Sequence, residues 1–408
     1  MGLVALDQLQ EGVILSEDVR DINGRLMLSK GQQITANHIR IFRIWGIPEI
    51  PVDAPQRSTP ADHASQKNTE KLLKTEHTVK KIFQNIDTHH PGIAALFKAA
   101  VDHRYEKDLL VEFGPQEPLA DNFKLDLSSG LKTQIAFSEI QLPEAPEIIS
   151  DYNKVVEDPL SSSNDIADVV NRSPSLAALL LKVVNSAFYG FPSKIDSLAR
   201  AVSIIGTKDI NALVTSISIM RLFHEMPEDL IDVATFRKHS LACGLLSRIL
   251  AAQRKLPHTE RLFVSGLLHD IGRLVWYRYF PEQAKLLLYM AKRTGLSVYE
   301  IEKECLGISH VQIAGHLLKK WKLPLSLANS IVYHHRPSRS PDPCEAGIVH
   351  MADIAINALG LGHSGEHIIP RFEAATWDRI GVAPGILMSA IGQTIEQLDV
   401  MEALLTEL

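Results

Sequence analysis

Seven side chains that can hold a metal ion are spread along the C-terminal half of this 408-residue chain. They are His239, His269, Asp270, His310, His334, His335 and Asp353. Imidazole and carboxylate groups are the ligands that divalent Fe, Mn, Zn and Mg ions take, whereas an oxygen and nitrogen set argues against Cu(I). Adjacent residues of a helix diverge by about 100°, so that both members of the His269-Asp270 pair can lean toward one pocket. The residue types therefore predict a buried site for a divalent metal ion.

A structural role is the alternative reading of any single histidine in this region. A lone histidine on an apolar helix face is usually a hydrogen-bonded core residue, and we interpret four further histidines in this way: His316, His350, His363 and His367. The seven metal candidates differ because they fall in several separate helix-like segments with aliphatic neighbours. Burying that many imidazoles and carboxylates without partners would cost several kcal/mol. A shared metal ion would offset this cost.

The elements that must position these residues are helices. From Leu142 to the end the pattern is nearly all helical, with apolar stripes that predict helices over 176–184, 198–205 and 209–223. Ser173 precedes Pro174 at a predicted helix start, and Gly206 follows a predicted helix end. We interpret the turn 185–190 as a structural corner in which Asn185 satisfies helix-end carbonyls, rather than as a partner-binding surface.

The N-terminal part has a different pattern. Residues 1–52 alternate short β-type runs with turns, and the Asn23-Gly24 dipeptide predicts a hairpin. A short helix over 36–45 and a last strand over 47–52 complete a small α+β module. Residues 53–141 form a linker and helical connector, which includes predicted helices over 71–86 and around 93–101. The predicted architecture is therefore mainly α, with a helical domain over 142–408.

Composition limits the classes of function. The 42 basic and 48 acidic side chains give a formal charge of −6, so no overall field favours phosphate backbones, and we expect no direct binding of nucleic acid. We also expect no membrane insertion and a cytoplasmic location, because no apolar stretch approaches the roughly 18 residues of a membrane helix and the start lacks a basic secretion signal. The three cysteines predict buried free thiols rather than disulfides or thiolate zinc sites.

Several motifs together resemble the HDOD family, a bacterial signalling branch of the HD superfamily of metal-dependent phosphohydrolases. The match runs from Leu142 to Pro337. It is carried by five segments: Leu142-Pro-Glu-Ala-Pro146, Ser173-Pro-Ser-Leu-Ala177, Val184-Asn-Ser-Ala-Phe-Tyr-Gly190, Leu198 to Ile204 with Gly206, and Ile331-Val-Tyr-His-His-Arg-Pro337. Residues 1–52 also resemble the small module that precedes some HD-GYP phosphodiesterase domains, through Leu9-Gln-Glu-Gly12, Asp21-Ile-Asn-Gly-Arg25 and Leu28-Ser-Lys-Gly31.

The resemblance to the HD superfamily implies roles for individual residues. It makes His239, His269, Asp270 and Asp353 the first metal set, while His310, His334 and His335 match the additional ligands of the related HD-GYP enzymes. Two departures stand out. Catalytic relatives commonly have lysine where this chain has Arg273, which keeps the positive charge with a different shape. The Gly-Tyr-Pro motif is absent, and His335 is followed by Arg-Pro-Ser-Arg-Ser-Pro instead.

Two functions remain open at this point. The first is a bacterial signal-transduction regulator whose HDOD domain binds partner proteins, including enzymes of nucleotide second messengers, with a divalent metal ion that serves structure. The second is a metal-dependent phosphohydrolase or cyclic-nucleotide phosphodiesterase, in which Arg273 or a spare histidine steadies the phosphate. A carboxylate-histidine iron sensor is a third hypothesis. The resemblance implies the regulator, and the retention of every ligand position favours the hydrolase.

Overall fold

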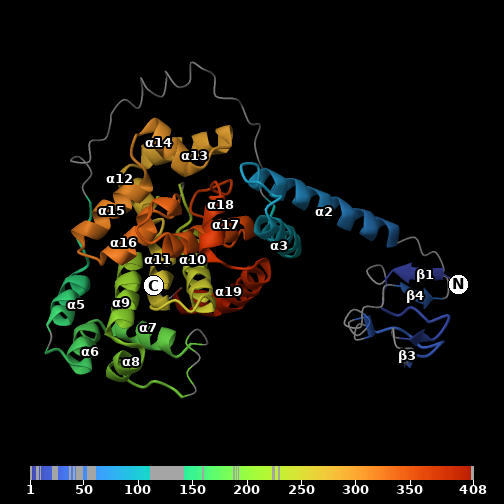
Figure 1. The fold of residues 1–408 in the computed structure, drawn as a ribbon, viewed down its shortest axis with the longest axis horizontal. Coiled ribbons are helices and arrows are strands. Elements are labelled where there is room, and N and C mark those ends of the chain that lie inside the picture. Colours follow the sequence, from blue (N-terminus) through green and yellow to red (C-terminus); the bar gives the residue numbers. More distant parts are fainter. Residues whose placement is uncertain are drawn as a thin grey trace. The chain divides into compact units, whose positions relative to one another are not determined.

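The computed structural model describes most of the chain (Figure 1). The described residues are 2–5, 9, 11–20, 26–35, 38–39, 42, 49–52, 61–110, 142–158, 160–186, 189, 191, 193–222, 226–227 and 230–405. Their contacts divide the chain into two units, residues 1–70 and 71–408. We describe each unit by itself.

The first unit is a small α+β module, as the sequence predicted. Strand β1 (Gly2–Ala5) pairs antiparallel with β4 (Glu49–Val52), and β2 (Val19–Arg20) pairs antiparallel with β3 (Leu26–Leu28). The β2–β3 pair confirms the predicted hairpin, whose Asn-Gly turn lies outside the described residues. A separate core of aliphatic and aromatic side chains, including Leu15, Ile34 and Phe42, holds this unit together.

The second unit is helical throughout its described part, which confirms the predicted fold class. Its helices are α2 (Ala61–Ile82, of which Lys71 onward belongs to this unit), α3 (Pro91–Lys107), α5 (Glu147–Glu157), α6 (Ser163–Asn171), α7 (Pro174–Val184), α8 (Leu198–Ile205), α9 (Thr207–Leu222), α10 (Val233–Gln253), α11 (Thr259–Leu268), α12 (Ile271–Tyr279), α13 (Pro281–Thr294), α14 (Val298–Cys305), α15 (His310–Lys320), α16 (Leu325–Val332), the short 3₁₀ turn η3 (Pro337–Arg339), α17 (Pro343–Leu359), α18 (Ala374–Ile380) and α19 (Pro384–Leu405). No helix among the described residues is long and apolar enough to cross a membrane.

Local signals account for many of the helix ends. Pro174 occupies the first turn of α7 after Ser173, and Gly206 ends α8 with a positive φ of 98°, both as predicted. Helix α6 is capped by Ser162, whose side chain forms a capping box with Asp165. The Asp232 carboxylate accepts a hydrogen bond from the Ala234 amide and so caps α10.

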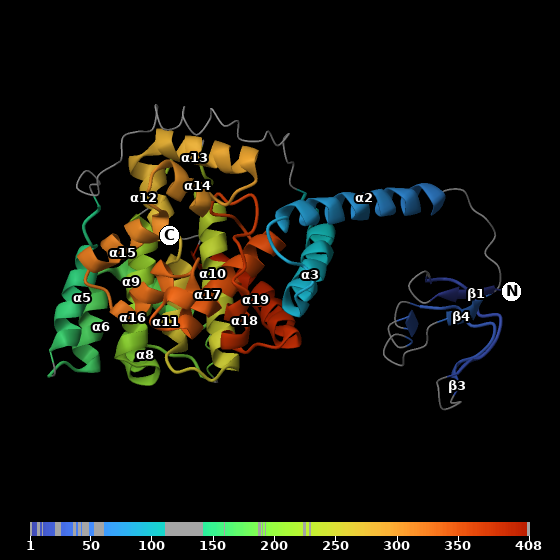
Figure 2. The same ribbon diagram turned by 45° about the horizontal axis from the view of Figure 1, so that its top comes forward.

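Helices α10, α11 and α17 pack against one another at the centre of the second unit (Figures 1 and 2). Helices α9 and α16 flank α11, α19 lies along α10, and α12 packs on α15. In Figure 1 α7 and α8 lie at one end of this unit, and α13 and α14 lie at the other; Figure 2 shows the same for α8, α13 and α14. The centre is therefore enclosed by helices from distant parts of the sequence.

Helix α3 belongs to this helical body, although it falls in the segment that the sequence suggests as a connector. It packs against α17 and α19. The buried Arg104 guanidinium donates hydrogen bonds to the carbonyls of Ala358 and Asn357 at the C-terminal end of α17, at 2.7 and 2.9 Å. A cation at this end also complements the helix dipole.

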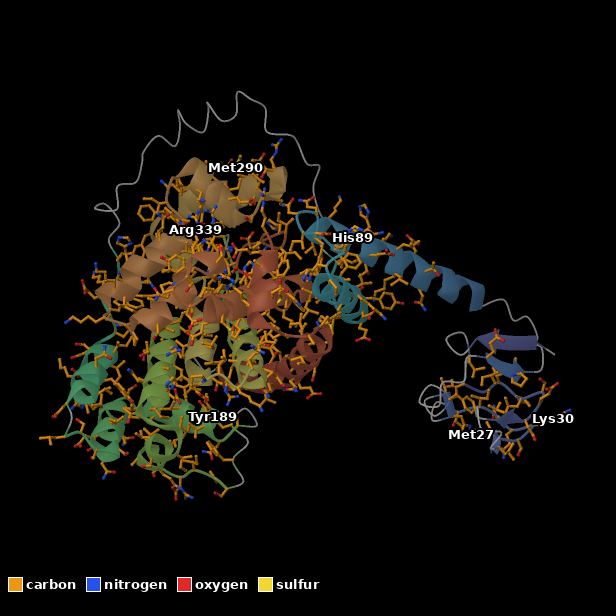
Figure 3. The ribbon with its side chains drawn as sticks, in the orientation of Figure 1. Met27, Lys30, His89, Tyr189, Met290 and Arg339 are labelled. Atoms are coloured by element: carbon orange, nitrogen blue, oxygen red, sulfur yellow. The ribbon has the colours of Figure 1, made fainter. Side chains whose placement is uncertain are left out.

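The predicted corner after α7 is confirmed at Asn185. Its side-chain amide donates to the carbonyls of Leu181 and Ile195, and its amide oxygen accepts from the Ile195 backbone, at distances of 2.7 to 2.8 Å. Tyr189 packs on the main core and stacks with Phe191 near α7 and α8 (Figure 3). Phe188 and Gly190, also part of this prediction, lie outside the described residues.

Candidate metal centre

All seven predicted ligands meet at the centre of the second unit. His239 comes from α10 and Asp353 from α17, while His269 and Asp270 occupy the junction between α11 and α12. The remaining three are at the start of α15 (His310) and just after α16 (His334 and His335). Each of the seven is at most 9% exposed. Residues up to 114 positions apart in the sequence, from His239 to Asp353, thus share one buried site.

The first group of potential ligands consists of His239, Cys243, His269 and Asp353, and we call it group A. The His239 Nε2 and His269 Nε2 atoms are 3.4 Å apart. The Asp353 Oδ1 atom lies 3.5 Å from each of these nitrogens. The Cys243 Sγ atom lies 3.6 Å from His239 Nε2. All four donor atoms lie within 4.8 Å of one another, close enough to share one ion.

The second group consists of Asp270, His310, His334 and His335, and we call it group B. The Asp270 Oδ1 atom lies 3.2 Å from His310 Nε2 and 3.9 Å from His334 Nε2. The Nε2 atoms of His310 and His335 are 3.2 Å apart. The other carboxylate oxygen of Asp270 lies 3.2 Å from His269 Nε2, so that Asp270 joins group B to group A.

Three of the imidazoles have their Nδ1 atoms held outside the cluster. His269 Nδ1 is 2.7 Å from the Gly266 carbonyl oxygen, and His334 Nδ1 is 2.7 Å from that of Ile331. His310 Nδ1 is 2.6 Å from the Glu302 carboxylate. An Nδ1–H that donates to an oxygen leaves the Nε2 lone pair free, and this arrangement is typical of histidines that bind metals. The Nε2 atoms that are left free are those that face one another inside the cluster.

Further charged and polar groups fix the carboxylates. The Arg273 Nε atom lies 3.0 Å from Asp270 Oδ1, and the same guanidinium pairs with Glu366 at 2.5 Å. The Asn357 side-chain amide donates to Asp353 Oδ1 at 2.6 Å. Arg273 is 1% exposed. Its guanidinium forms ion pairs with Asp270 and Glu366 and donates a hydrogen bond to the Ser364 carbonyl. This geometry gives Arg273 a positioning role at Asp270.

The pKa shifts give the ligands the charges that metal binding needs. Burial alone would raise the pKa of Asp270, but Arg273 and His269 hold that pKa well below its usual range. Asp353 has a similarly lowered pKa because it accepts hydrogen bonds from His239 and His269, which outweigh burial. Burial lowers the pKa of His334 to about 3. The carboxylates are therefore ionised and this imidazole is neutral, as metal ligands must be.

The pKa of His269 shifts in the opposite direction. Burial lowers it, but the Asp270 and Asp353 carboxylates outweigh burial and raise it to about 10. In the absence of a metal ion, the cluster therefore attracts a positive charge to the position between these two carboxylates. A proton on His269 and a divalent cation are alternative ways to supply that charge.

Unsatisfied buried atoms test whether the site fits a metal ion. Both carboxylate oxygens of Asp270 and the His334 Nε2 atom are fully buried and have no hydrogen-bond partner of suitable geometry, although Arg273 Nε is within ion-pair distance of one of the oxygens. Buried polar atoms are rarely left in this state. The nitrogen and oxygen donors point at one another across 3.2 to 3.9 Å, so a cation between them would satisfy them. The residues present therefore fit a divalent metal ion.

Gly266 and Gly272, which lie on either side of the His269-Asp270 pair, allow this close packing. A Cβ atom on Gly272 would lie 2.0 Å from the His310 carbonyl oxygen, and one on Gly266 would lie 2.5 Å from the Cys243 carbonyl oxygen. Both distances are below 3.0 Å, which real Cβ atoms essentially never show. The glycines therefore bring α12 against α15 and α11 against α10, with the ligands of both groups between them.

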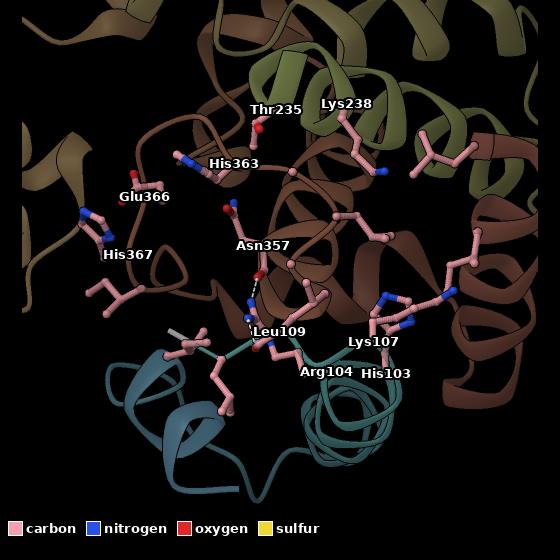
Figure 4. A pocket seen from close by; sticks show the side chains of 18 of the residues that line it. His103, Arg104, Lys107, Leu109, Thr235, Lys238, Asn357, His363, Glu366 and His367 are labelled. Carbon is pink, nitrogen blue, oxygen red and sulfur yellow. Dashed lines mark hydrogen bonds between the residues drawn. The ribbon is translucent and has the colours of Figure 1, made fainter. Parts of the chain in front are cut away.

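The large pocket shown in Figure 4 lies beside the centre and not within it. Its volume is about 760 Å³, and its walls come from α3, α10, α17, α19 and the segment after α17. Asn357 and Glu366 line it, and both contact residues that hold the cluster. None of the seven predicted ligands lines it. The histidines that we interpreted as structural are outside both groups, and His363 and His367 line this pocket.

Cys243 and Glu302 are the members of this site that the sequence interpretation missed. Cys243 is four residues after His239 on the same helix, and this spacing places two side chains on one face. That spacing was a usable signal. No comparable sequence signal pointed to Glu302, because this residue reaches His310 only through the packing of α14 beside the start of α15.

Comparisons with known proteins identify one domain of this chain. Residues 142–337 match the sequence profile of the HDOD domain. An uncharacterized protein of Treponema pallidum (strain Nichols) is 24% identical over 245 residues, which cover 59% of this chain and 47% of that protein. The chain therefore spans about half the length of this curated relative.

Solved structures share the fold. An HDOD domain protein of unknown function from Geobacter sulfurreducens is 20% identical, with a TM-score of 0.54, over 69% of this chain and 98% of its own. A candidate signal transduction protein from Marinobacter aquaeolei VT8 is 21% identical, with a TM-score of 0.52, over 79% of this chain and 67% of its own. The likeness of residues 1–52 to the module of HD-GYP proteins stays a prediction.

Proposed function

We propose that this chain, whose residues 142–337 form an HDOD domain, is a signal-transduction regulator that acts by binding partner proteins. In this proposal a buried pair of divalent metal ions fastens the helices of the second unit, and its role is structural. The partners are other signalling proteins, among them enzymes of nucleotide second messengers. The domain assignment supports the regulatory class, and the centre described above supports the structural role of the metal.

One observation carries the structural role: each group supplies four protein donors, and every ligand is buried. Structural zinc sites are closed by four protein ligands, whereas catalytic sites keep one position for water or substrate. Groups A and B follow the closed pattern. The pocket of Figure 4, which could admit a small molecule, contains none of the donor atoms.

The residues that would hold the ions follow from the two groups. Group A would hold one ion and group B would hold the other, with the Asp270 carboxylate of group B beside His269 of group A. When bound, divalent cations neutralise the buried carboxylates and add their binding free energy to folding. Glu302 keeps His310 oriented, and Arg273 and Asn357 keep the Asp270 and Asp353 carboxylates in place.

A phosphohydrolase is the second candidate, and the position of Asp270 favours it. A carboxylate shared by two groups of ligands is suited to a pair of neighbouring ions, and two-metal sites of this kind hydrolyse phosphate esters in other enzymes. Arg273 is not free to steady a phosphate in this structure, because its guanidinium is engaged by Asp270, Glu366 and Ser364. The segment after His335 also enters the short η3 turn at Pro337 in place of a Gly-Tyr-Pro motif.

Hydrolysis assays separate the two candidates. Full-length protein loaded in turn with Zn²⁺, Mn²⁺ and Fe²⁺ is incubated with cyclic-di-GMP and with bis(p-nitrophenyl) phosphate, and product is measured over time. We expect no turnover above that of the Asp270→Ala variant. Turnover in the usual enzymatic range of about 1–1000 per second, abolished by Asp270→Ala, would establish the hydrolase instead.

A further inference from the structure

We propose that Cys243 binds metal as a thiolate and completes group A as a tetrahedral site that selects Zn²⁺ or Fe²⁺ over Mg²⁺ and Mn²⁺. This inference rests on the proposed metal centre and adds to it the identity of a ligand and the class of metal. It also reverses the expectation from the sequence that no cysteine of this chain serves a thiolate zinc site.

The position of Cys243 is the first argument. His239 and Cys243 are four residues apart on α10, and both are fully buried. Residues with this spacing are neighbours on one face of a helix. The Sγ atom accordingly lies 3.6 Å from His239 Nε2 and within 4.8 Å of the donor atoms of His269 and Asp353. The sulfur therefore lies close enough to the other three donors to serve as the fourth ligand of one ion.

The spacing of the donors is the second argument. Metal–ligand bonds of about 2.0–2.1 Å place neighbouring donors about 3.3–3.4 Å apart in a tetrahedron. The same bonds place them only about 2.8–3.0 Å apart in an octahedron, the geometry that Mg²⁺ demands. The three distances among His239 Nε2, His269 Nε2 and Asp353 Oδ1 are 3.4, 3.5 and 3.5 Å. This nearly equilateral triangle has the dimensions of one face of a tetrahedron.

The sulfur distance agrees with the same geometry. A Zn–S bond of about 2.3 Å and a Zn–N bond of about 2.05 Å, at the tetrahedral angle, place sulfur and nitrogen about 3.5–3.6 Å apart. The Sγ–Nε2 distance is 3.6 Å. Because a metal-bound thiol is deprotonated and a thiolate is a soft ligand, the completed site favours Zn²⁺ or Fe²⁺ over the harder Mg²⁺ and Mn²⁺.

The competing fourth ligand is the Asp270 oxygen that faces group A. It lies 3.2 Å from His269 Nε2, and if it filled the fourth place, Cys243 would remain a protonated core thiol. The other Asp270 oxygen faces His310 and His334, which assigns this carboxylate first to group B. The two arrangements differ in whether sulfur is bound to the metal, and sulfur ligation has a direct spectroscopic signature.

Cobalt substitution tests the proposal on the full-length protein. Metal is removed with a chelator, and Co²⁺ is titrated in the absence of oxygen while the absorption spectrum is recorded. We expect intense visible bands of tetrahedral Co²⁺ together with a sulfur-to-cobalt charge-transfer band in the near ultraviolet. The Cys243→Ser variant should lose the charge-transfer band and bind Zn²⁺ at least about tenfold more weakly, since even supporting residues of metal sites contribute that much.

The matched control is the Cys305→Ser/Cys344→Ser double variant, whose two thiols are outside both groups and only partly buried. It should keep the charge-transfer band. Cobalt bound by the wild type without that band would overturn the thiolate ligand and leave the metal centre standing. Failure of the wild type to bind any cobalt would overturn both.

X-ray absorption at the zinc edge of the wild type decides the question if Cys243→Ser does not fold. A sulfur shell at about 2.3 Å supports the proposal, and a spectrum fitted by nitrogen and oxygen at about 2.0–2.1 Å alone contradicts it.

Discussion

At the scale of single residues, Asp270 determines the character of the centre. One of its oxygens faces His269 in group A, and the other faces His310 and His334 in group B. Arg273 holds this carboxylate from the side, and Glu366 in turn holds Arg273. The chain of ion pairs Asp270–Arg273–Glu366 is fully buried, so that no member can lose its partner without cost.

Replacement of Arg273 tests this chain of ion pairs. In Arg273→Met, Asp270 and Glu366 lose their buried cation, and unfolding in urea should show a loss of about 3–5 kcal/mol, as for other broken buried pairs. Arg273→Lys should lose less, because it keeps the charge but not the planar fork. Wild-type stability in Arg273→Met would show that the guanidinium is not needed to hold Asp270.

The seven ligands could be named from the sequence because their residue types, apolar surroundings and motif spacing all point to metal. The partners that orient them could not be named in this way. Glu302 and Glu366 are ordinary acidic residues in sequence, and only the packing of α14 and of the segment after α17 brings them to His310 and Arg273. The sequence suggested that Arg273 steadies a phosphate. It could not show that Asp270, Glu366 and the Ser364 carbonyl already engage this guanidinium, because Glu366 and Ser364 are far from Arg273 in the chain.

At the scale of elements, the centre depends on helices that approach very closely. The His-Asp pair sits at the junction of α11 and α12, and glycines on both sides of it let these helices touch α10 and α15. The sequence predicted helix ends well where caps are local, as at Pro174 and Gly206. It could not predict which helices cross at these glycines, because that contact joins residues far apart in the chain.

Substitution of Gly272 tests this close approach. In Gly272→Ala the added methyl group would meet the backbone of His310, which cannot move without displacing a ligand of group B. We expect a loss of about 1–3 kcal/mol in stability, as for other overpacked sites, together with weaker metal binding, both followed by thermal unfolding with and without chelator.

Gly385→Ala is the matched control for this substitution. Gly385 is in α19, with open space where its Cβ atom would be. Its replacement should leave stability unchanged or raise it slightly, because alanine lowers the entropy of the unfolded chain. If Gly272→Ala behaved like this control, the helices would not be held as closely as we describe.

At the scale of the whole molecule, the sequence predicted a mainly helical chain with a small N-terminal α+β module, and both are confirmed in the described residues. For residues 53–141 the sequence predicted helices but not their packing. In the structure α3 packs on α17 and α19 as part of the helical body. Weakly amphipathic helices such as α3 give little signal by themselves. Their place is decided by contacts such as Arg104 with the end of α17.

The account requires that metal ions belong to the folded second unit. The ligands meet at the centre from five separate stretches of sequence, and the ions would join these stretches to one another. A ligand that binds only the folded state stabilises it by mass action. Removal of the ions should therefore lower the melting temperature of the whole second unit rather than loosen one helix.

Elemental analysis of the purified full-length protein tests the central claim most directly. Metal content per chain is measured by mass spectrometry for the wild type, His269→Ala and Asp270→Ala. We predict two divalent ions per wild-type chain, one for each group. Both variants should lose metal, and Asp270→Ala should lose more, because its carboxylate faces both groups. A wild-type chain that contains no stoichiometric metal, or an Asp270→Ala chain that keeps the full amount, would contradict the account.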